Sequence, residues 1–327
     1  MSWFFKQNSA KNKRAFPLTG YNLKVFSGSG NEELAQEIAE KLSVRLGDRE
    51  VLRFANGECL VKVLETARGE DCFIIQPTCS DSEIMELLIF IDALKRSSAA
   101  RITAVIPWFG YARQDRQASS REPITAKLVA RLLETAGADR VIALDLHSGQ
   151  IQGFFDIPVD NLTAIQFLEK EISKKELGEF VIVAPDAGAA KACTKIARRL
   201  GKELAIINKI RPRENVCETI NIIGEVKGKN CVMFDDMIDT GGSLINAACA
   251  LKKAGALKVL ACATHGIFSG NALENFEKSE IEEVIVTNSR PQKSAGGKIK
   301  VLSISKILSE AILRNHENRS VSELFPK

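Results

Sequence analysis

Two aspartates and a glycine-rich turn form the stretch of this chain with the clearest chemical potential. Asp235 and Asp236 follow four apolar residues, 231–234, which predict a strand buried on both faces of a parallel sheet. A turn of Thr240, Gly241, Gly242 and Ser243 then leads into an apolar segment spaced for a helix. Glycines in such a turn let backbone N–H groups approach an anion at the positive end of the helix, and hydroxyls add donors. This pattern predicts a phosphate seat.

The two carboxylates indicate what else binds there. Because carboxylates repel a phosphate, we expect Asp235 and Asp236 to bind sugar hydroxyls or a metal ion. The stretch as a whole therefore favours a phosphorylated sugar as ligand. The alternative is an ordinary strand-to-helix turn that the aspartates merely cap.

Polar residues also follow other predicted strands, at the edge where open α/β sheets bind ligands. After strand 102–107, Arg113, Arg116 and Arg121 lie in one loop and are suited to clamp a polyphosphate through bidentate contacts. A solvated charged loop is the alternative. His147 follows strand 141–146 beside Asp145, which makes it a candidate for ligand binding or proton transfer, or a structural histidine.

Two further strands end in weaker signals. Asp186 stands in a glycine-containing turn after strand 180–184. Lys209, Arg211 and Arg213 follow strand 204–208, where they form either a cationic functional loop or a solvated face. The sequence has no G-x-x-x-x-G-K-[ST] motif, so a nucleotide would not bind in a Walker loop.

Composition limits the function classes. A chain of 327 residues with 45% apolar and 26% charged residues is of ordinary globular type and suggests about two domains. A net charge of +4 is too small to indicate nucleic acid but suits an anionic substrate. The eight cysteines include no Cys-x-x-Cys, which predicts neither zinc nor disulfides and favours a reducing cytoplasm. No apolar run is long enough to span a membrane, and residues 1–17 do not read as a secretory signal.

The elements that position these residues alternate along the chain, which predicts the α/β class. Around residues 55–57, two short strands at 51–54 and 59–64 predict a hairpin. Strands and helices then alternate in consecutive βα units, from 72–76 through 82–95, 102–107, 124–136 and 141–146. A second series with the same order begins near residue 164, so we expect two mostly parallel sheets flanked by helices.

Four motifs together resemble those of the ribose-phosphate diphosphokinases, or phosphoribosyl-pyrophosphate synthetases, from about Leu23 to Phe325. They are Arg-Phe-Ala-Asn-Gly-Glu at 53–58, Tyr-Ala-Arg-Gln-Asp at 111–115, Asp-Leu-His at 145–147 with residues 150–156, and the stretch 231–247. The resemblance implies two type I phosphoribosyltransferase-like domains. After an N-terminal extension of residues 1–20, the first domain comprises residues 21–163 and also includes the C-terminal segment 306–327. The second domain comprises residues 164–305. It also implies transfer of the diphosphoryl group of Mg-ATP to the 1-hydroxyl of ribose 5-phosphate, which yields phosphoribosyl diphosphate and AMP for nucleotide biosynthesis.

The resemblance assigns roles to individual residues of this chain. Lys209 and Arg211 are implied to be the catalytic cations. The residues implied to bind ATP are Phe54, Asn56, Glu58, Arg113, Gln114 and His147, the first three across a subunit boundary. Those implied to bind ribose 5-phosphate are Asp235, Asp236, Asp239, Thr240, Gly241, Gly242 and Ser243. His147 and Asp186 are implied to reach the Mg²⁺, and Arg68, Ser320, Ser322 and Phe325 to bind regulatory phosphate or ADP.

A cytoplasmic homo-oligomer, a hexamer of dimers, is the expected assembly by the same resemblance. Four positions depart from the common family pattern: Ala189, Ala192, Asn208 and Ile210. They motivate a first alternative, a non-catalytic regulatory paralogue that associates with the active synthetase. A second alternative is a phosphoribosyltransferase that shares the 231–247 stretch, although such an enzyme needs no ATP site.

Overall fold

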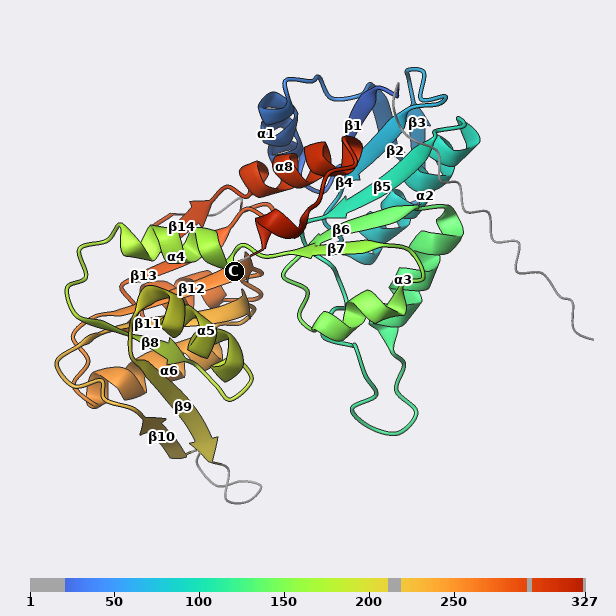
Figure 1. The fold of residues 1–327 in the computed structure, drawn as a ribbon. Coiled ribbons are helices and arrows are strands. Elements are labelled where there is room, and N and C mark those ends of the chain that lie inside the picture. Colours follow the sequence, from blue (N-terminus) through green and yellow to red (C-terminus); the bar gives the residue numbers. More distant parts are fainter. Residues whose placement is uncertain (1–20, 211–218, 293–295, 326–327) are drawn as a thin grey trace, which may run out of the picture.

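The computed structural model describes residues 21–210, 219–292 and 296–325, which form two α/β halves (Figure 1). The first half contains a five-stranded sheet with the order β1-β4-β5-β6-β7, and every pair of neighbours is parallel. These strands are β1 (Leu23–Ser27), β4 (Asp71–Ile75), β5 (Arg101–Ile106), β6 (Arg140–Leu144) and β7 (Val159–Leu162). The predicted parallel sheet is thus confirmed for this half.

Helices cover both faces of the first sheet. Helices α2 (Asp81–Arg96) and α3 (Thr125–Ala136) pack on one face, where Phe90 and Leu133 are fully buried among the side chains of the strands. Helices α1 (Glu32–Leu42) and α8 (Ser305–His316) pack on the other face, around Phe73 and Ile75. The α1 helix begins where predicted, because the Asn31 side chain accepts a hydrogen bond from the Leu34 N–H at 3.2 Å.

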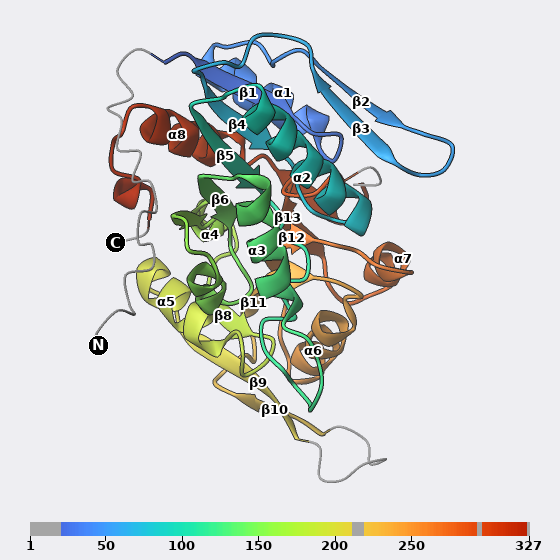
Figure 2. The same cartoon turned by 90° about the vertical axis from the view of Figure 1, so that its right-hand side faces the viewer.

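A separate antiparallel hairpin lies beside this sheet. It consists of β2 (Arg49–Arg53) and β3 (Cys59–Val63), and it extends away from the body of the molecule in Figure 2. At the tip, Gly57 has a φ of 90°, and its N–H donates to the Phe54 carbonyl at 2.8 Å. The hairpin predicted around residues 55–57 is therefore confirmed.

The second half contains a seven-stranded sheet with the order β10-β9-β8-β11-β12-β13-β14. It is parallel except for β10, which runs antiparallel to β9. Helices α4 and α5 cover one face, and α6 and α7 cover the other. The strands are β8 (Phe180–Ala184), β9 (Leu204–Ile210), β10 (Thr219–Ile223), β11 (Asn230–Ile238), β12 (Val259–Gly266), β13 (Glu283–Thr287) and β14 (Ile299–Leu302). The helices are α4 (Ile165–Ser173), α5 (Ala190–Leu200), α6 (Gly242–Lys253) and α7 (Ala272–Glu277).

The C-terminal helix α8 returns to the first half. Its Leu308 and Ile312 are fully buried in the same apolar cluster as Val25 of β1. Beyond them, His316 Nδ1 lies 2.9 Å from Oδ2 of the buried Asp71. Figure 1 shows α8 beside α1, so these two helices, far apart in sequence, form one layer on this face of the sheet.

Some predicted boundaries are wrong. The strand predicted at 231–234 continues to Ile238, because Asp235 and Met237 still pair with Ala263 and His265 of β12. The strand predicted at 204–208 continues to Ile210, so Lys209 lies inside β9 rather than after it. Strands β7 and β10 were not predicted, and α4 ends at Ser173 rather than near residue 177.

Candidate active site

A cavity of about 460 Å³ lies between the two halves. Its walls come from the loops after β6 and β8, from the carboxyl-side part of β11 and from helices α4 and α5. They include Asp145, His147, Asp186, Ala189, Ala192, Asp235, Asp236 and Thr264. The structure therefore brings together predicted residues from three separate strands and from both halves of the chain.

His147 and Asp236 join the halves across this cavity. His147 Nδ1 lies 2.6 Å from Asp236 Oδ2, and the two residues are 89 positions apart in sequence. The hydrogen bond to Asp236 raises the pKa of His147, although burial acts in the opposite direction. A residue predicted to bind ATP is thus in direct contact with a residue predicted to bind ribose.

Asp235 and Asp236 differ in their protonation. Burial raises the pKa of Asp235 to about 8, and the adjacent charge of Asp236 adds to the effect. Burial also acts to raise the pKa of Asp236, but hydrogen bonds with His147 and Asp235 outweigh it and hold that pKa below its usual value. The two adjacent carboxylates thus have pKa values shifted in opposite directions, and both have oxygens that can accept hydrogen bonds from sugar hydroxyls.

The carboxylates and the histidine of the cavity fit a Mg²⁺ ion that takes its remaining ligands from substrate phosphates and water. Among the residues that the structure describes, no three His, Cys, Asp or Glu side chains gather at metal-ligand spacing. Mg²⁺ is usually held by one or two carboxylates together with substrate phosphates and water. His147 and Asp186 both line the cavity, but one Asp186 oxygen already accepts the Ala189 N–H at 3.0 Å, in the turn before α5.

The predicted phosphate seat lies at the N-terminus of α6. Gly241, the residue before the helix, has a φ of +76°, and a Cβ there would lie 2.5 Å from the Phe276 ring. At Gly242, the first helical residue, a Cβ would meet only Thr240 Oγ1, at 4.0 Å. The turn thus has the glycine-dependent geometry that the sequence predicts, with Gly242 N–H at the positive end of the helix.

A second ion pair connects the halves beside this turn. Arg113 Nη1 lies 2.7 Å from Asp239 Oδ2. The pKa of Asp239 is lowered by hydrogen bonding to Ser269 and by the nearby Arg113 guanidinium. Gln114 is held at the start of α3, where its Oε1 accepts from Thr125 Oγ1 at 2.6 Å. The arginine loop therefore lies next to the predicted phosphate seat.

Other predicted residues lie elsewhere. Phe54, Asn56 and Glu58 are exposed at the hairpin tip and do not line the cavity of their own chain. Ser322 and Phe325 line a different cavity, of about 320 Å³, whereas Arg68 is exposed outside it. The Ser320 hydroxyl accepts a hydrogen bond from the N–H of Ser322 at 3.2 Å. Lys209 is placed in β9, and Arg211 lies outside the described residues.

Sequence reasoning missed a group that holds the halves together. The Asp145 side chain accepts from Thr264 Oγ1 at 2.6 Å and from the Ala164 N–H at 2.8 Å, and its backbone has a φ of 39°. His265 Nε2 donates to the Asp145 carbonyl at 3.2 Å, and burial lowers the His265 pKa. The only available signal was the position of Thr264 and His265 at the carboxyl end of a predicted strand.

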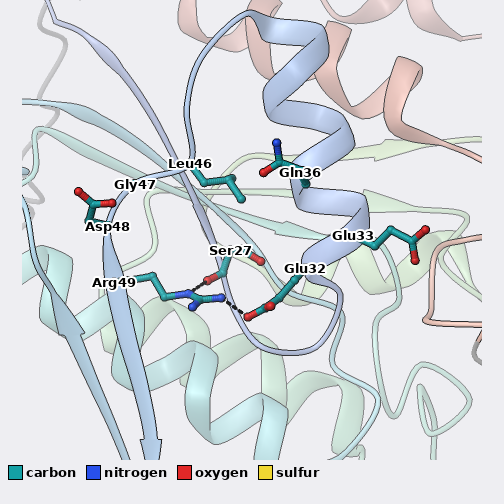
Figure 3. A pocket seen from close by; sticks show the side chains of 8 residues that line it. All are labelled: Ser27, Glu32, Glu33, Gln36, Leu46, Gly47, Asp48 and Arg49. Carbon is teal, nitrogen blue, oxygen red and sulfur yellow. Dashed lines mark hydrogen bonds and ion pairs between the residues drawn. The ribbon is translucent and has the colours of Figure 1, made fainter.

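A larger cavity near α1, of about 520 Å³, lacks these features (Figure 3). Its one cationic lining residue, Arg49, donates to the Ser27 carbonyl at 2.7 Å and pairs with Glu32. The guanidinium is therefore already neutralised. None of the residues predicted to bind substrate or metal lines this cavity.

Two mostly parallel sheets with a carboxylate-lined cavity between them define an α/β protein of the kind that binds ligands at the carboxyl ends of its strands. Models for the N-terminal domain of ribose phosphate pyrophosphokinase and for the phosphoribosyl synthetase-associated domain match residues 23–137 and 209–326. The ribose-phosphate pyrophosphokinase of Bacillus subtilis is 53% identical over 308 residues, which are 93% of this chain and 97% of that protein. That of Thermosipho africanus is 52% identical over 307 residues, with the same coverage of 93% and 97%.

The crystal structure of phosphoribosylpyrophosphate synthetase from Mycobacterium smegmatis is also similar. It is 43% identical, has a TM-score of 0.86 and covers 91% of this chain and 99% of that chain. This chain belongs to the ribose-phosphate pyrophosphokinase family, as its motifs predict. No helix in the described ranges is long and apolar enough to cross a membrane.

Proposed function

We propose that this protein transfers the diphosphoryl group of Mg-ATP to the 1-hydroxyl of ribose 5-phosphate and so forms 5-phosphoribosyl 1-diphosphate and AMP. The observation that carries the proposal is the 2.6 Å contact between His147 and Asp236 across the cavity. It joins the residues assigned to ATP and those assigned to ribose at one site. The family relationship supports the same reaction.

Each group of residues has its own task in this proposal. Asp235 and Asp236, which line the cavity, hold the ribose hydroxyls, and the turn Asp239–Ser243 holds the 5-phosphate at the N-terminus of α6. His147 holds ATP from the other side of the cavity, together with Arg113 and Gln114, which line a separate cavity of about 350 Å³. The 2.7 Å contact between Arg113 and Asp239 supports this arrangement, because it joins a residue proposed to bind ATP to a residue proposed to bind ribose 5-phosphate.

The chemistry requires positioning and electrostatic stabilisation. The 1-hydroxyl of ribose attacks the β-phosphorus, the bond to the α-phosphate oxygen breaks, and AMP leaves while negative charge grows on the transferring oxygens. When bound, Mg²⁺ offsets charge on the phosphate oxygens. Lys209 and Arg211 supply fixed positive charge to the same oxygens, and His147 binds ATP. The proton of the attacking hydroxyl passes to solvent.

Four further parts of the proposal rest on the family relationship. They are Mg²⁺ as cofactor, phosphate and ADP as effectors at Arg68, Ser320, Ser322 and Phe325, a cytoplasmic location for nucleotide biosynthesis, and a homo-oligomer. The exposed hairpin tip favours the last, because Phe54, Asn56 and Glu58 would reach the adenine bound to a neighbouring copy.

The decisive experiment is incubation of the purified protein with Mg-ATP and ribose 5-phosphate in phosphate buffer, followed by separation of the nucleotides. AMP and phosphoribosyl diphosphate are expected in equal amounts, and omission of ribose 5-phosphate should prevent AMP formation. A protein that forms neither product contradicts the proposal and favours the regulatory paralogue. ADP as the sole nucleotide product would indicate transfer of a single phosphate and would also contradict it.

A further inference from the structure

A fully buried carboxylate contacts the end of β2 that leads into the hairpin tip, outside the site described above. Glu86 of α2 has 0% of its side chain exposed. Its two oxygens accept four hydrogen bonds: from the N–H and the hydroxyl of Ser29, both at 2.7 Å, from Gln76 Nε2 at 3.3 Å and from Arg53 Nη2 at 2.7 Å. The four donors come from the loop after β1, from the residue after β4 and from β2.

An apolar side chain would stabilise this position at least as well as an ion pair does, because burying a charge costs several kcal/mol per ion. What the carboxylate adds is a set of hydrogen bonds with defined directions, which fix the positions of the groups that donate them. The neighbouring Gln76 tightens the arrangement, since its Oε1 accepts the Gly30 N–H at 2.9 Å and fills the space where Gly28 would carry a Cβ. The β1–α1 loop is therefore a rigid platform beneath the hairpin.

Strand β2 has a side-chain anchor at each of its ends. At its first residue, Arg49 donates to the Ser27 carbonyl and pairs with Glu32 (Figure 3). At its last residue, Arg53 pairs with Glu86 and also donates to the Ser82 carbonyl at 3.3 Å. Phe54 follows immediately, 48% exposed at the hairpin tip. The direction of the tip is thus set by the last anchor before it.

We propose that the Arg53–Glu86 pair is a positioning device that aims the hairpin tip at the adenine of ATP. The inference rests on the proposed function. Neither residue touches the substrate: Arg53 acts through Phe54, Asn56 and Glu58, and Glu86 acts through Arg53. The pair therefore affects apparent affinity for ATP and leaves ribose 5-phosphate binding and the chemical step unchanged.

The test uses Arg53→Met, Arg53→Lys and the double variant Arg53→Met/Glu86→Gln in the full-length protein. Arg53→Met leaves Glu86 buried without its cation, so the melting temperature falls and the KM for ATP rises at least fivefold. In the double variant the buried charge is gone, so the melting temperature recovers while the KM for ATP stays high. Arg53→Lys keeps a cation and retains a KM for ATP within twofold of wild type.

The control is Lys62→Met, which removes an exposed ion pair of the same hairpin, Lys62 Nζ to Glu50 Oε2 at 3.4 Å. It should change neither KM nor melting temperature. The inference is overturned if the double variant has a wild-type KM for ATP, if the KM for ribose 5-phosphate rises in parallel, or if Lys62→Met behaves like Arg53→Met. A wild-type protein that forms no AMP overturns the proposed function and this inference with it, whereas an active wild type with unchanged variants overturns the inference alone.

Discussion

Adding one methyl group at Gly241 should destabilise the second half of the molecule far more than adding it at Gly242. At Gly241 the new Cβ would lie 2.5 Å from one carbon of the Phe276 ring and 2.6 Å from another. This ring is 0% exposed and packs edge-on against Phe268 at 6.0 Å, so it has little room to move. The φ of +76° adds conformational strain for any residue other than glycine.

The magnitude follows from these two terms. An L-residue in the left-handed region costs about 1–2 kcal/mol, and overpacking of a core costs about 1–3 kcal/mol, so Gly241→Ala should cost about 3 kcal/mol. For a folding unit of this size that corresponds to a fall of about 6–12 °C in melting temperature. The methyl group of Gly242→Ala would have no neighbour closer than 4.0 Å. Because alanine also favours a helix more than glycine does, the melting temperature of this variant should equal or slightly exceed that of wild type.

Melting followed by circular dichroism at equal protein concentration measures the difference. The same two proteins also test the phosphate seat, because Gly242→Ala should raise the KM for ribose 5-phosphate without loss of stability if the Gly242 N–H approaches the phosphate. The packing argument is refuted if Gly241→Ala melts within 1 °C of wild type. Equal destabilisation by both variants would refute it as well.

Three other predictions concern charge. Lys209→Ala should lower kcat by about 10²–10³-fold at an unchanged melting temperature. The control Lys202→Ala removes an ammonium that lies 4.5 Å from the centre of the Phe180 ring, and it should leave kcat unchanged. Turnover of Lys209→Ala near that of wild type would show that Lys209 is not catalytic. Chelation with EDTA should abolish AMP formation and added Mg²⁺ should restore it; activity that survives chelation would contradict a Mg²⁺ requirement. The hydrogen bond from Lys300, 2.6 Å away, lowers the pKa of Glu171 in the folded protein. The stabilisation that this pair gives the folded state is therefore complete above the pKa of a glutamate in the unfolded chain, about 4.3, and is lost as the pH falls through the lower pKa of Glu171 in the folded protein. Lys300→Met should therefore cost about 0.5–1 kcal/mol at pH 7, and its melting temperature should converge with that of wild type on acidification; a difference independent of pH would count against this.

The periodic parts of the fold could be predicted from the sequence, and the irregular parts could not. The hairpin around residues 55–57 and the helix that begins after Asn31 have strong local signals, a glycine turn and an N-cap. Strand β7 has the sequence Val-Asp-Asn-Leu, which alternates too little to indicate a strand, and forms by pairing with β6. Likewise, the length of β11 depends on its neighbour β12, which the local pattern does not contain.

The candidate site shows the same limit. His147, Asp186, Asp235 and Asp236 could be predicted from their places near the carboxyl ends of strands, and the phosphate turn from its two glycines. The contacts of His147 with Asp236 and of Arg113 with Asp239 depend on how the two halves pack, over separations of 89 and 126 residues. The contacts of Asp145 between the two halves could not be predicted either, because a φ of 39° at an aspartate has no sequence signal comparable to a glycine.

The return of α8 to the first sheet has a consequence for biosynthesis. One face of that sheet, with Val25, Phe73 and Ile75 fully buried, is covered in part by Ile307 to Ile312, which the ribosome adds only after the second half. During translation this face therefore stays without its final cover while the whole second half is made, although domains often fold in the order of synthesis. A nascent chain halted before residue 305 would expose an apolar sheet surface and be a target for chaperones, whereas release of the finished chain would close it.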